Sequence, residues 1–147
     1  MKAKRDHVVP LSRQAVELLA AQKEKTGHGS YVFPSPLDER IHICETGLLA
    51  VVKEIASNIG AMTSHGFKAM GSTLLNGHKN HEIEGFILPR YDKDLIEIQL
   101  AHLEKDRVRD SYNRRDPYSR IQERREMVQT YADLLDHLRN QYAQSLQ

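Results

Sequence analysis

The sequence predicts a mainly α-helical fold with one small β element at its N-terminal end. Apolar residues recur at spacings of three and four along most of the 147-residue chain, as on helices that pack through one face. Only residues 2–9 are typical of a strand, and Pro10 ends it. We expect this strand to form a small hairpin or sheet element, whose pairing partner could lie outside this chain.

The bulk composition predicts a soluble protein of one domain. With 39% apolar and 28% charged residues, the chain can form a hydrophobic core of ordinary size. No apolar run approaches the roughly 20 residues that cross a bilayer, and no secretory signal is recognisable, so we expect no membrane partner. Cys44 is the only cysteine, which excludes an intrachain disulfide and favours the reducing cytoplasm. We expect Cys44 to be a small core residue.

The first half of the chain predicts two helices separated by a short extended segment. Ser12 is a good N-cap for a helix over residues 13–25, which Gly27 would end. The apolar run Tyr31-Val32-Phe33 is expected to be buried. Thr46 could cap a second helix that ends at Gly60, with its inward face formed by Leu48, Leu49, Val52, Ile55 and Ala56.

The second half predicts further helices around a long loop. Thr63 or Ser64 would cap a helix over 65–76, with Phe67, Met70, Leu74 and Leu75 facing inward and His65, Lys68 and Ser72 on the other face. Residues 77–91 are expected to be a loop, and Asp92 to start a helix that ends near His102. A short helical piece follows at 108–112.

Asp116-Pro117 predicts the start of a last helix over 117–145. Its apolar residues form a narrow seam, which is either intramolecular core or a contact between protomers. The seam consists of Val128, Tyr131, Leu135, Leu138 and Tyr142.

The charge distribution is more informative than the net charge of +1. Residues 105–125 contain eight Lys/Arg against four Asp/Glu, and residues 1–5 add three positive side chains. A local basic excess fits contact with phosphates, whereas a solvated helix surface with ion pairs is the simpler explanation.

Two groups of residues could carry chemistry. His65 and Lys68 lie in the first turns of a predicted helix, whose N-terminal N–H groups and dipole attract phosphate, although exposed His and Lys are common on helices. Tyr112 stands beside Arg114 and Arg115, where positive charge would favour the nucleophilic phenolate, although most tyrosines are core or rim residues. The remaining histidines lack the compact spacing of zinc ligands, so we expect no metal site.

The order of these groups resembles the tyrosine recombinase family, in particular the integrases of prophages and genomic islands. That family carries, in order, an arginine, a hairpin lysine, His-x-x-Arg, a second histidine or tryptophan, and a nucleophilic tyrosine. The matching segments span nearly the whole chain: Lys2 in the run from Met1 to Ser12, Tyr31-Val32-Phe33-Pro34-Ser35, Ser64-His65-Gly66-Phe67-Lys68-Ala69-Met70, Gln99-Leu100-Ala101-His102 and Tyr112-Asn113-Arg114.

The resemblance implies a truncated recombinase catalytic domain that cleaves and rejoins DNA. Tyr112 would attack the scissile phosphate, and Lys2 would protonate the leaving 5′-oxygen. Lys2 is preferred over Lys4 because it lies eight residues before Pro10, as the family lysine does before its proline. His65 and His102 would support proton transfer and hold phosphate oxygens, and no metal or other cofactor is needed.

The implied partners are double-stranded DNA and other recombinase protomers in a synaptic tetramer, with the protein on the nucleoid in the cytoplasm. We expect six basic residues to contact DNA, namely Lys4, Arg5, Arg107, Arg109, Arg114 and Arg115. The resemblance also implies a partial domain over residues 1–147, with a β element at 1–10, a helical core at 12–112 and a C-terminal helix at 117–145.

Two departures from the family pattern bear on activity. The first arginine would precede residue 1, and Lys68 stands where the second is expected. Lysine is a point charge, whereas arginine grips two phosphate oxygens, and losing one such donor typically costs about 10²–10³ in rate. We therefore expect the chain alone to be nearly inert. Three hypotheses stay open: the catalytic part of a recombinase, a catalytically dead DNA-binding remnant, and a helical interaction module.

Overall fold

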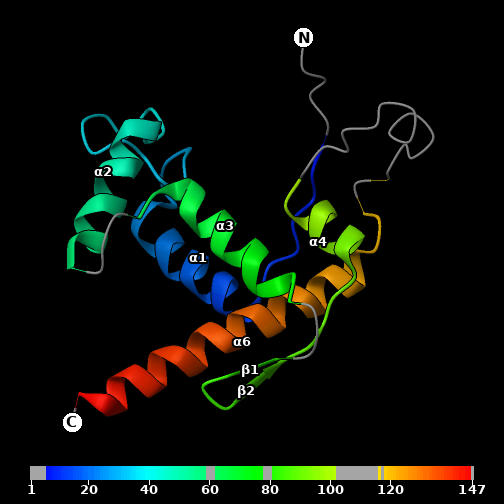
Figure 1. Cartoon of the computed structure of the whole chain (residues 1–147). Coiled ribbons are helices and arrows are strands. Elements are labelled where there is room, and N and C mark those ends of the chain that lie inside the picture. Colours follow the sequence, from blue (N-terminus) through cyan, green and yellow to red (C-terminus); the bar gives the residue numbers. More distant parts are fainter. Residues whose placement is uncertain (1–5, 59–61, 78–80, 102–115, 117, 147) are drawn as a thin grey trace. The chain divides into compact units, whose positions relative to one another are not determined.

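The computed structural model describes residues 6–58, 62–77, 81–101, 116 and 118–146. The described chain is mostly helical with one two-stranded antiparallel sheet, as Figure 1 shows. Its elements are α1 (Arg13–Thr26), α2 (Glu45–Ile55), the 3₁₀ turn η1 (Ala56–Asn58), α3 (Ser64–Leu75), β1 (His81–Ile83), β2 (Phe86–Leu88), α4 (Lys93–Gln99) and α6 (Ile121–Ser145). The mainly α prediction is confirmed.

The chain divides into two compact units. Unit 1 comprises residues 1–12 and 72–147, and unit 2 comprises residues 13–71. None of the helices within the described ranges is both long and apolar enough to cross a membrane.

The core of unit 1 lies where α4 packs against α6. Leu95 and Ile96 of α4 are buried with Met127 of α6 and Leu75 from the end of α3. Tyr91, Leu100 and Tyr131 pack around them. Burial of these side chains is the main stabilising contribution that the described part of unit 1 shows.

The β element is a hairpin at 81–88, so the predicted loop over 77–91 is wrong in that range. His81 pairs with Leu88, and Ile83 pairs with Phe86. Glu84 and Gly85 form the turn, and both have positive φ, at 49° and 82°. Two positive φ angles are the pattern of a type I′ turn, whose twist suits a hairpin.

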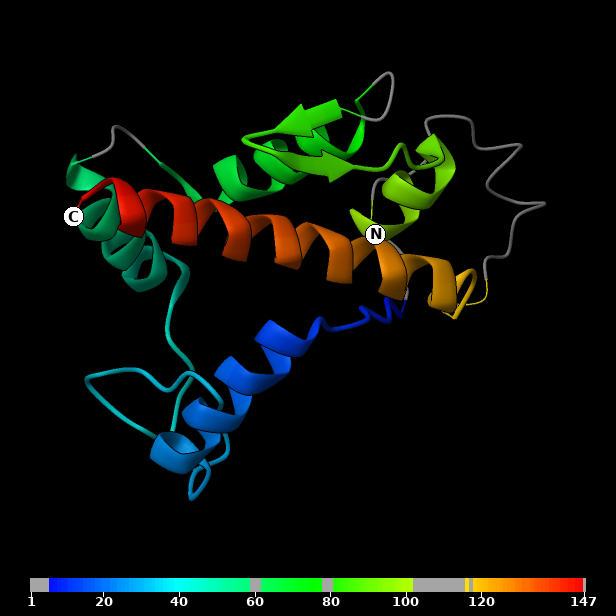
Figure 2. The ribbon, with the colours of Figure 1, turned by 90° about the horizontal axis from the view of Figure 1, so that it is seen from below.

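Side chains of α6 hold this hairpin turn. Nε2 of His137 lies 2.6 Å from the carbonyl oxygen of Glu84, and Gln141 donates to the same oxygen at 3.2 Å. The ring of Phe86 also lies 5.6 Å from the imidazole of His137. Figure 2 shows the strands running beside α6. These contacts are tertiary, which is why the hairpin is poorly marked in the local sequence.

The predicted N-terminal strand is not formed in its described part. Residues 6–12 adopt neither strand nor helix, although Pro10 and Ser12 are buried. Instead of a neighbouring strand, the guanidinium of Arg124 donates to the Val8 carbonyl. Residues 1–5 lie outside the described residues.

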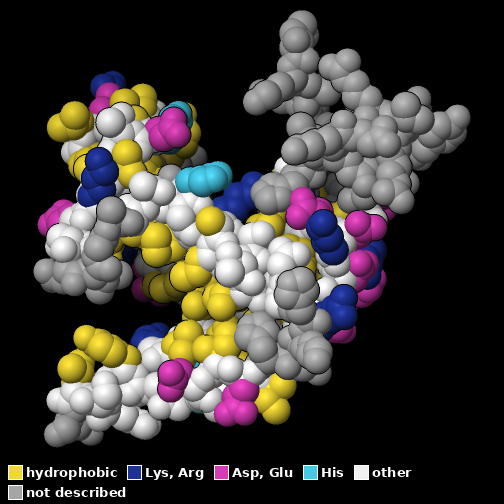
Figure 3. Space-filling view, in the orientation of Figure 1, with side chains coloured by type: hydrophobic (Ala, Val, Ile, Leu, Met, Phe, Trp, Pro, Cys, Tyr) yellow, Lys and Arg dark blue, Asp and Glu magenta, His cyan; other side chains and the backbone are white. Residues whose placement is uncertain are grey.

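The last helix begins later than predicted and buries a different row. The carboxylate of Asp116 accepts from the Tyr118 N–H and so closes a turn, and Arg120, at φ 53°, precedes the first residue of α6. The buried side chains of α6 are Arg124, Met127 and Leu134. Leu135 and Tyr142 of the predicted seam are exposed, and Figure 3 shows apolar side chains at the surface towards the C-terminal end of α6.

In unit 2 several predicted core residues are exposed. Phe33 is 56% exposed and Ile55 is 74% exposed, and Tyr31, Val32, Leu48 and Phe67 also contact solvent. The segment around Phe33 is held by backbone hydrogen bonds to Ile41 and Ile43 rather than by burial. Cys44 is exposed as well, and it caps α2 in place of Thr46 because its Sγ accepts from the Gly47 N–H at 3.3 Å. That bond lowers the pKa of the thiol.

Candidate functional site

The start of α3 positions the two predicted phosphate ligands that the structure describes. Thr63 caps the helix, since its Oγ1 accepts from the Gly66 N–H at 3.1 Å. His65 and Lys68 follow in the first two turns, three residues apart, and therefore project from neighbouring turns of one face. His65 is exposed, and Lys68 is partly exposed. An imidazole and an ammonium on this face, near a helix N-terminus, suit an anionic ligand.

Gly66 lies between these two residues, where Met62 packs closely against the start of the helix. A Cβ built on Gly66 would lie 2.9 Å from the sulfur of Met62 and 3.6 Å from Oγ1 of Thr63. The flexible Met62 side chain would have to shift to make room for it.

The other predicted site residues lie outside the described residues. This holds for the nucleophile Tyr112, for the general acid Lys2 and for the second histidine, His102. It also holds for the predicted DNA-contacting residues Lys4, Arg5, Arg107, Arg109, Arg114 and Arg115. Their predicted convergence on one phosphate stays a prediction.

Arg120 forms an ion-pair network that joins the start of α6 to the start of α4. Asp92 caps α4 by accepting from the Asp94 N–H at 3.2 Å, and it also accepts from Nη1 of Arg120. Arg120 binds both carboxylate oxygens of Glu123, through Nε at 2.9 Å and Nη2 at 2.6 Å. The bond from Arg120 lowers the pKa of Asp92, with the Asp94 N–H second, and it also lowers the pKa of Glu123.

Arg124 is a buried charge that the charge pattern did not reveal. It belongs to the basic residues of 105–125, yet its side chain is buried inside unit 1. Nε donates to Oε1 of Gln99 at 3.0 Å, and burial lowers the pKa of the guanidinium. The spacing along the sequence does indicate its burial, because Arg124, Met127 and Tyr131 follow one another at intervals of three and four residues and so share one face of the helix.

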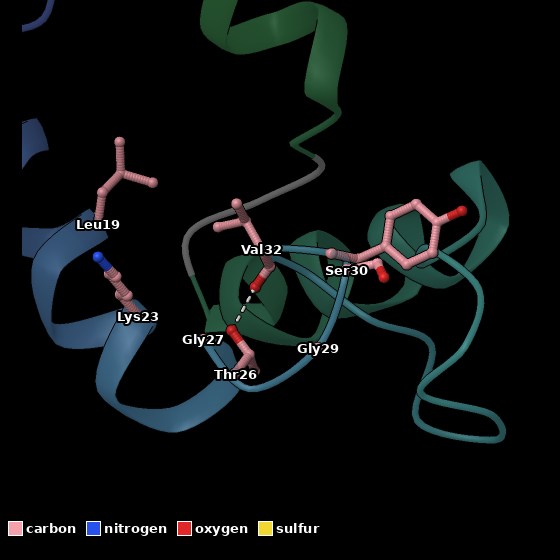
Figure 4. Close-up of a pocket in the computed structure, with 8 residues that line it drawn as sticks. Leu19, Lys23, Thr26, Gly27, Gly29, Ser30 and Val32 are labelled. Atoms are coloured by element: carbon pink, nitrogen blue, oxygen red, sulfur yellow. Dashed lines mark hydrogen bonds between the residues drawn. The ribbon is translucent and has the colours of Figure 1, made fainter.

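A cavity of about 310 Å³ lies in unit 2, between α1 and the turn that follows it. Figure 4 shows Leu19 and Lys23 from α1 on one side and Val32 on the other, with the Thr26 hydroxyl donating to the Val32 carbonyl at 2.8 Å. None of the predicted catalytic residues lines it. Among the described residues, no three His, Cys, Asp or Glu side chains are grouped as a metal site would need.

Known proteins similar to this chain are phage and prophage integrases. Prophage integrase IntZ of Escherichia coli strain K12 is 39% identical over 138 residues, which is 94% of this chain and 30% of that protein. Prophage integrase IntS of the same strain is 38% identical, over 92% of this chain and 32% of that protein. The integrase of Shigella phage Sf6 is 37% identical, over 92% of this chain and 32% of that protein.

No family model matches the chain, and no solved structure matches it. The similarity to the integrases nevertheless covers more than nine-tenths of the residues of this chain. The chain therefore belongs, along nearly its whole length, to the phage integrase family, and it spans about a third of the length of the integrases that it matches.

Proposed function

We propose that this chain supplies part of the active site of a site-specific DNA recombinase that works through a phosphotyrosine intermediate. The observation that carries the proposal is the 39% identity to a prophage integrase over 94% of the chain, with the predicted catalytic residues in the family's order. The position of His65 and Lys68 on one face at the start of α3 supports it.

In the proposed reaction the Tyr112 phenol gives up its proton to the imidazole of His65 or His102 as its oxygen attacks the scissile phosphorus. A phosphotyrosyl bond to the 3′ side of the break forms as the bond to the 5′-oxygen breaks, and Lys2 donates a proton to that oxygen. Attack by a 5′-hydroxyl reverses these steps and rejoins a strand. The phosphodiester energy is kept in the tyrosyl link, so no external energy source is needed.

His65, Lys68 and His102 would stabilise the charge that grows on the phosphate. Donors fixed in advance around a developing oxyanion are among the largest contributions to such catalysis. Lys68 provides one charge at this position, where an arginine would provide a planar pair of donors. We therefore propose that the chain alone cleaves DNA very slowly, and that full activity, site choice and assembly with other protomers require the remainder of an integrase.

A nicked DNA substrate tests the proposal, because the short cleaved strand diffuses away and traps the covalent adduct. We expect an adduct that survives denaturing electrophoresis and is lost in Tyr112→Phe, with Tyr118→Phe as the matched control, since Tyr118 is an exposed tyrosine at the start of the turn before α6. Lys68→Arg is expected to raise the adduct yield.

The other two hypotheses predict different outcomes of the same experiment. A DNA-binding remnant would bind duplex DNA at low salt, where phosphate contacts are strongest, and give no adduct, and Lys68→Arg in a longer chain that carries an upstream arginine would restore the adduct. A helical interaction module would not bind DNA under these conditions. Either result contradicts the proposal that this chain itself cleaves DNA.

A further inference from the structure

Arg124 occupies an unusual place for a charged residue. Its side chain is 1% exposed and is the largest of the fully buried side chains in the described chain. Removing a guanidinium from water is unfavourable unless its N–H groups are hydrogen-bonded, and an apolar residue of similar size would often be tolerated at such a position. Arginine here therefore points to a role in specifying geometry.

Its hydrogen bonds join three parts of unit 1. From α6, Nε of Arg124 donates to the side chain of Gln99, the last residue of α4, at 3.0 Å, and Nη2 donates to the backbone carbonyl of Val8. The backbone carbonyl of Gln99 also accepts from the imidazole of His7 at 3.3 Å. Along the sequence, Arg124 is 116 residues from Val8 and 25 residues from Gln99, and His7 is 92 residues from Gln99. We call this group of four residues the Arg124 junction.

The Arg124 junction connects residues 6–12 to α4 and α6. This segment forms neither strand nor helix, so no regular backbone pairing within the described residues fixes its register. The side chains of His7 and Arg124 instead connect it to α4 and α6. Pro10 and Ser12, buried on the C-terminal side of these contacts, hold the other end of the segment.

Each of the three joined parts lies close in the sequence to one proposed active-site residue. In the sequence, Val8 follows Lys2 by six residues, Gln99 precedes His102 by three, and α6 begins nine residues after Tyr112. We propose that Arg124 is a positioning residue, whose guanidinium fixes the register of residues 6–12 against the C-terminal end of α4. The catalytic consequence rests on the proposed function, whereas the junction itself does not.

The geometry requires arginine in particular. A guanidinium is planar, and its Nε and Nη2 donors point in different directions, so one side chain can reach an acceptor on α4 and another on the N-terminal segment. The single ammonium of a lysine keeps the charge but not this fixed pair of directions. Methionine keeps much of the volume and has no donor.

A distance measured between two spin labels tests the proposal in the full chain. The exposed residues Asp6 and Lys93, both in unit 1, are changed to cysteine in a Cys44→Ser background and labelled. Pulsed electron paramagnetic resonance then gives the distance distribution between segment 6–12 and α4. We expect one narrow distribution in the parent and its loss in both Arg124→Met and Arg124→Lys.

Arg125→Met is the matched control, because Arg125 is the next residue of α6 and its exposed side chain donates to Gln122, within the same helix, at 2.8 Å. We expect it to keep the narrow distribution. A contribution of Arg124 to stability alone would lower the urea midpoint and leave the distance in the folded chain unchanged. An unchanged narrow distribution in folded Arg124→Lys and Arg124→Met would overturn the proposal.

Substitutions of Gln99 keep the test decisive if the Arg124 variants do not fold. Gln99→Glu keeps an oxygen acceptor for Nε and should keep the narrow distribution, whereas Gln99→Leu removes the acceptor and should broaden it. Equal distributions in these two variants would contradict the junction. Because the distance is measured without DNA, a missing Tyr112 adduct would refute the proposed function and leave this result standing.

Discussion

At the scale of single residues, Asp92 combines two tasks, of which the sequence predicts only the first. It caps α4 and it binds Arg120 just before α6 begins. Both bonds favour the carboxylate over the carboxylic acid and therefore lower the pKa of Asp92 in the folded chain. The local sequence shows the cap, but the bond to a residue 28 positions away is a property of the fold.

The lowered pKa of Asp92 predicts acid sensitivity of unit 1. A carboxyl group with a folded-state pKa below its unfolded value stabilises the fold above the unfolded value, near 3.8, and loses this contribution as the pH falls through the folded value. We expect Asp92→Asn to weaken the acid dependence of unfolding below pH 3.8. Urea titrations followed by circular dichroism at several pH values measure it. Glu126→Gln, an exposed position on α6, is the control, and an equal effect there would refute the assignment.

At the scale of elements, the β1–β2 hairpin depends on an unfavourable turn. Glu84 adopts φ 49° without being glycine or asparagine, and Gly85 adopts φ 82°. Bonds from His137 and Gln141 to the Glu84 carbonyl hold this conformation. The turn is thus stabilised by contacts with α6 at Glu84 and by the tolerance of Gly85 for positive φ.

Two substitutions in the turn should have opposite effects. Gly85→Ala should lower the free energy of unfolding by about 1 kcal/mol, because a Cβ is disfavoured at positive φ. No atom lies within 4 Å of the new Cβ, so a steric clash does not contribute. Glu84→Asn should raise stability by a few tenths of a kcal/mol, since asparagine tolerates this region. Amide exchange of residues 81–88 measures both, and a stabilising Gly85→Ala would contradict the turn assignment.

The elements also show which features the sequence could predict. The sequence predicts Asp92 as a helix start and leaves the cap of α3 between Thr63 and Ser64, because an N-cap acts on backbone groups two or three residues away; the structure has Asp92 and Thr63 as the caps. Asp116 shows the limit of that argument. Its carboxylate also accepts from a backbone N–H two residues later, but this bond closes a turn, and α6 begins only after Arg120. The buried row of α6 was misplaced because it includes Arg124, which a hydrophobic pattern skips. In the candidate site, His65 and Lys68 were placed on one face of α3 by spacing alone, whereas the Arg124 junction depends on tertiary contacts.

At the scale of the whole molecule, the two units differ in how much apolar surface they bury. Among the described apolar residues, Ala56 alone is buried in unit 2, whereas Leu75, Leu88, Leu95, Ile96, Met127 and Leu134 are buried in unit 1. Each fully buried aliphatic side chain contributes about 1.5–3 kcal/mol. The described part of unit 1 therefore has the larger apolar contribution to its stability.

This difference predicts that the units unfold separately. Amides of α1 and α2 should exchange at lower urea concentration than those of α4 and α6. Met127→Ala should remove about 2–5 kcal/mol from unit 1, because Met127 is fully buried, and should leave the exchange of α1 unchanged. Hydrogen exchange followed by mass spectrometry separates the two sets of amides. A single transition for all helices would show that the chain unfolds as one cooperative body.

The turn before α6 joins the start of that helix to the start of α4. Asp116 accepts from the backbone N–H groups of Tyr118 and Ser119 in this turn, and Arg120 donates to Asp92, the N-cap of α4. The carboxylate of Asp92 thus serves the beginnings of two helices that are far apart in the sequence. Fraying of either helix end removes a hydrogen-bond partner from the other, so the two ends should open together.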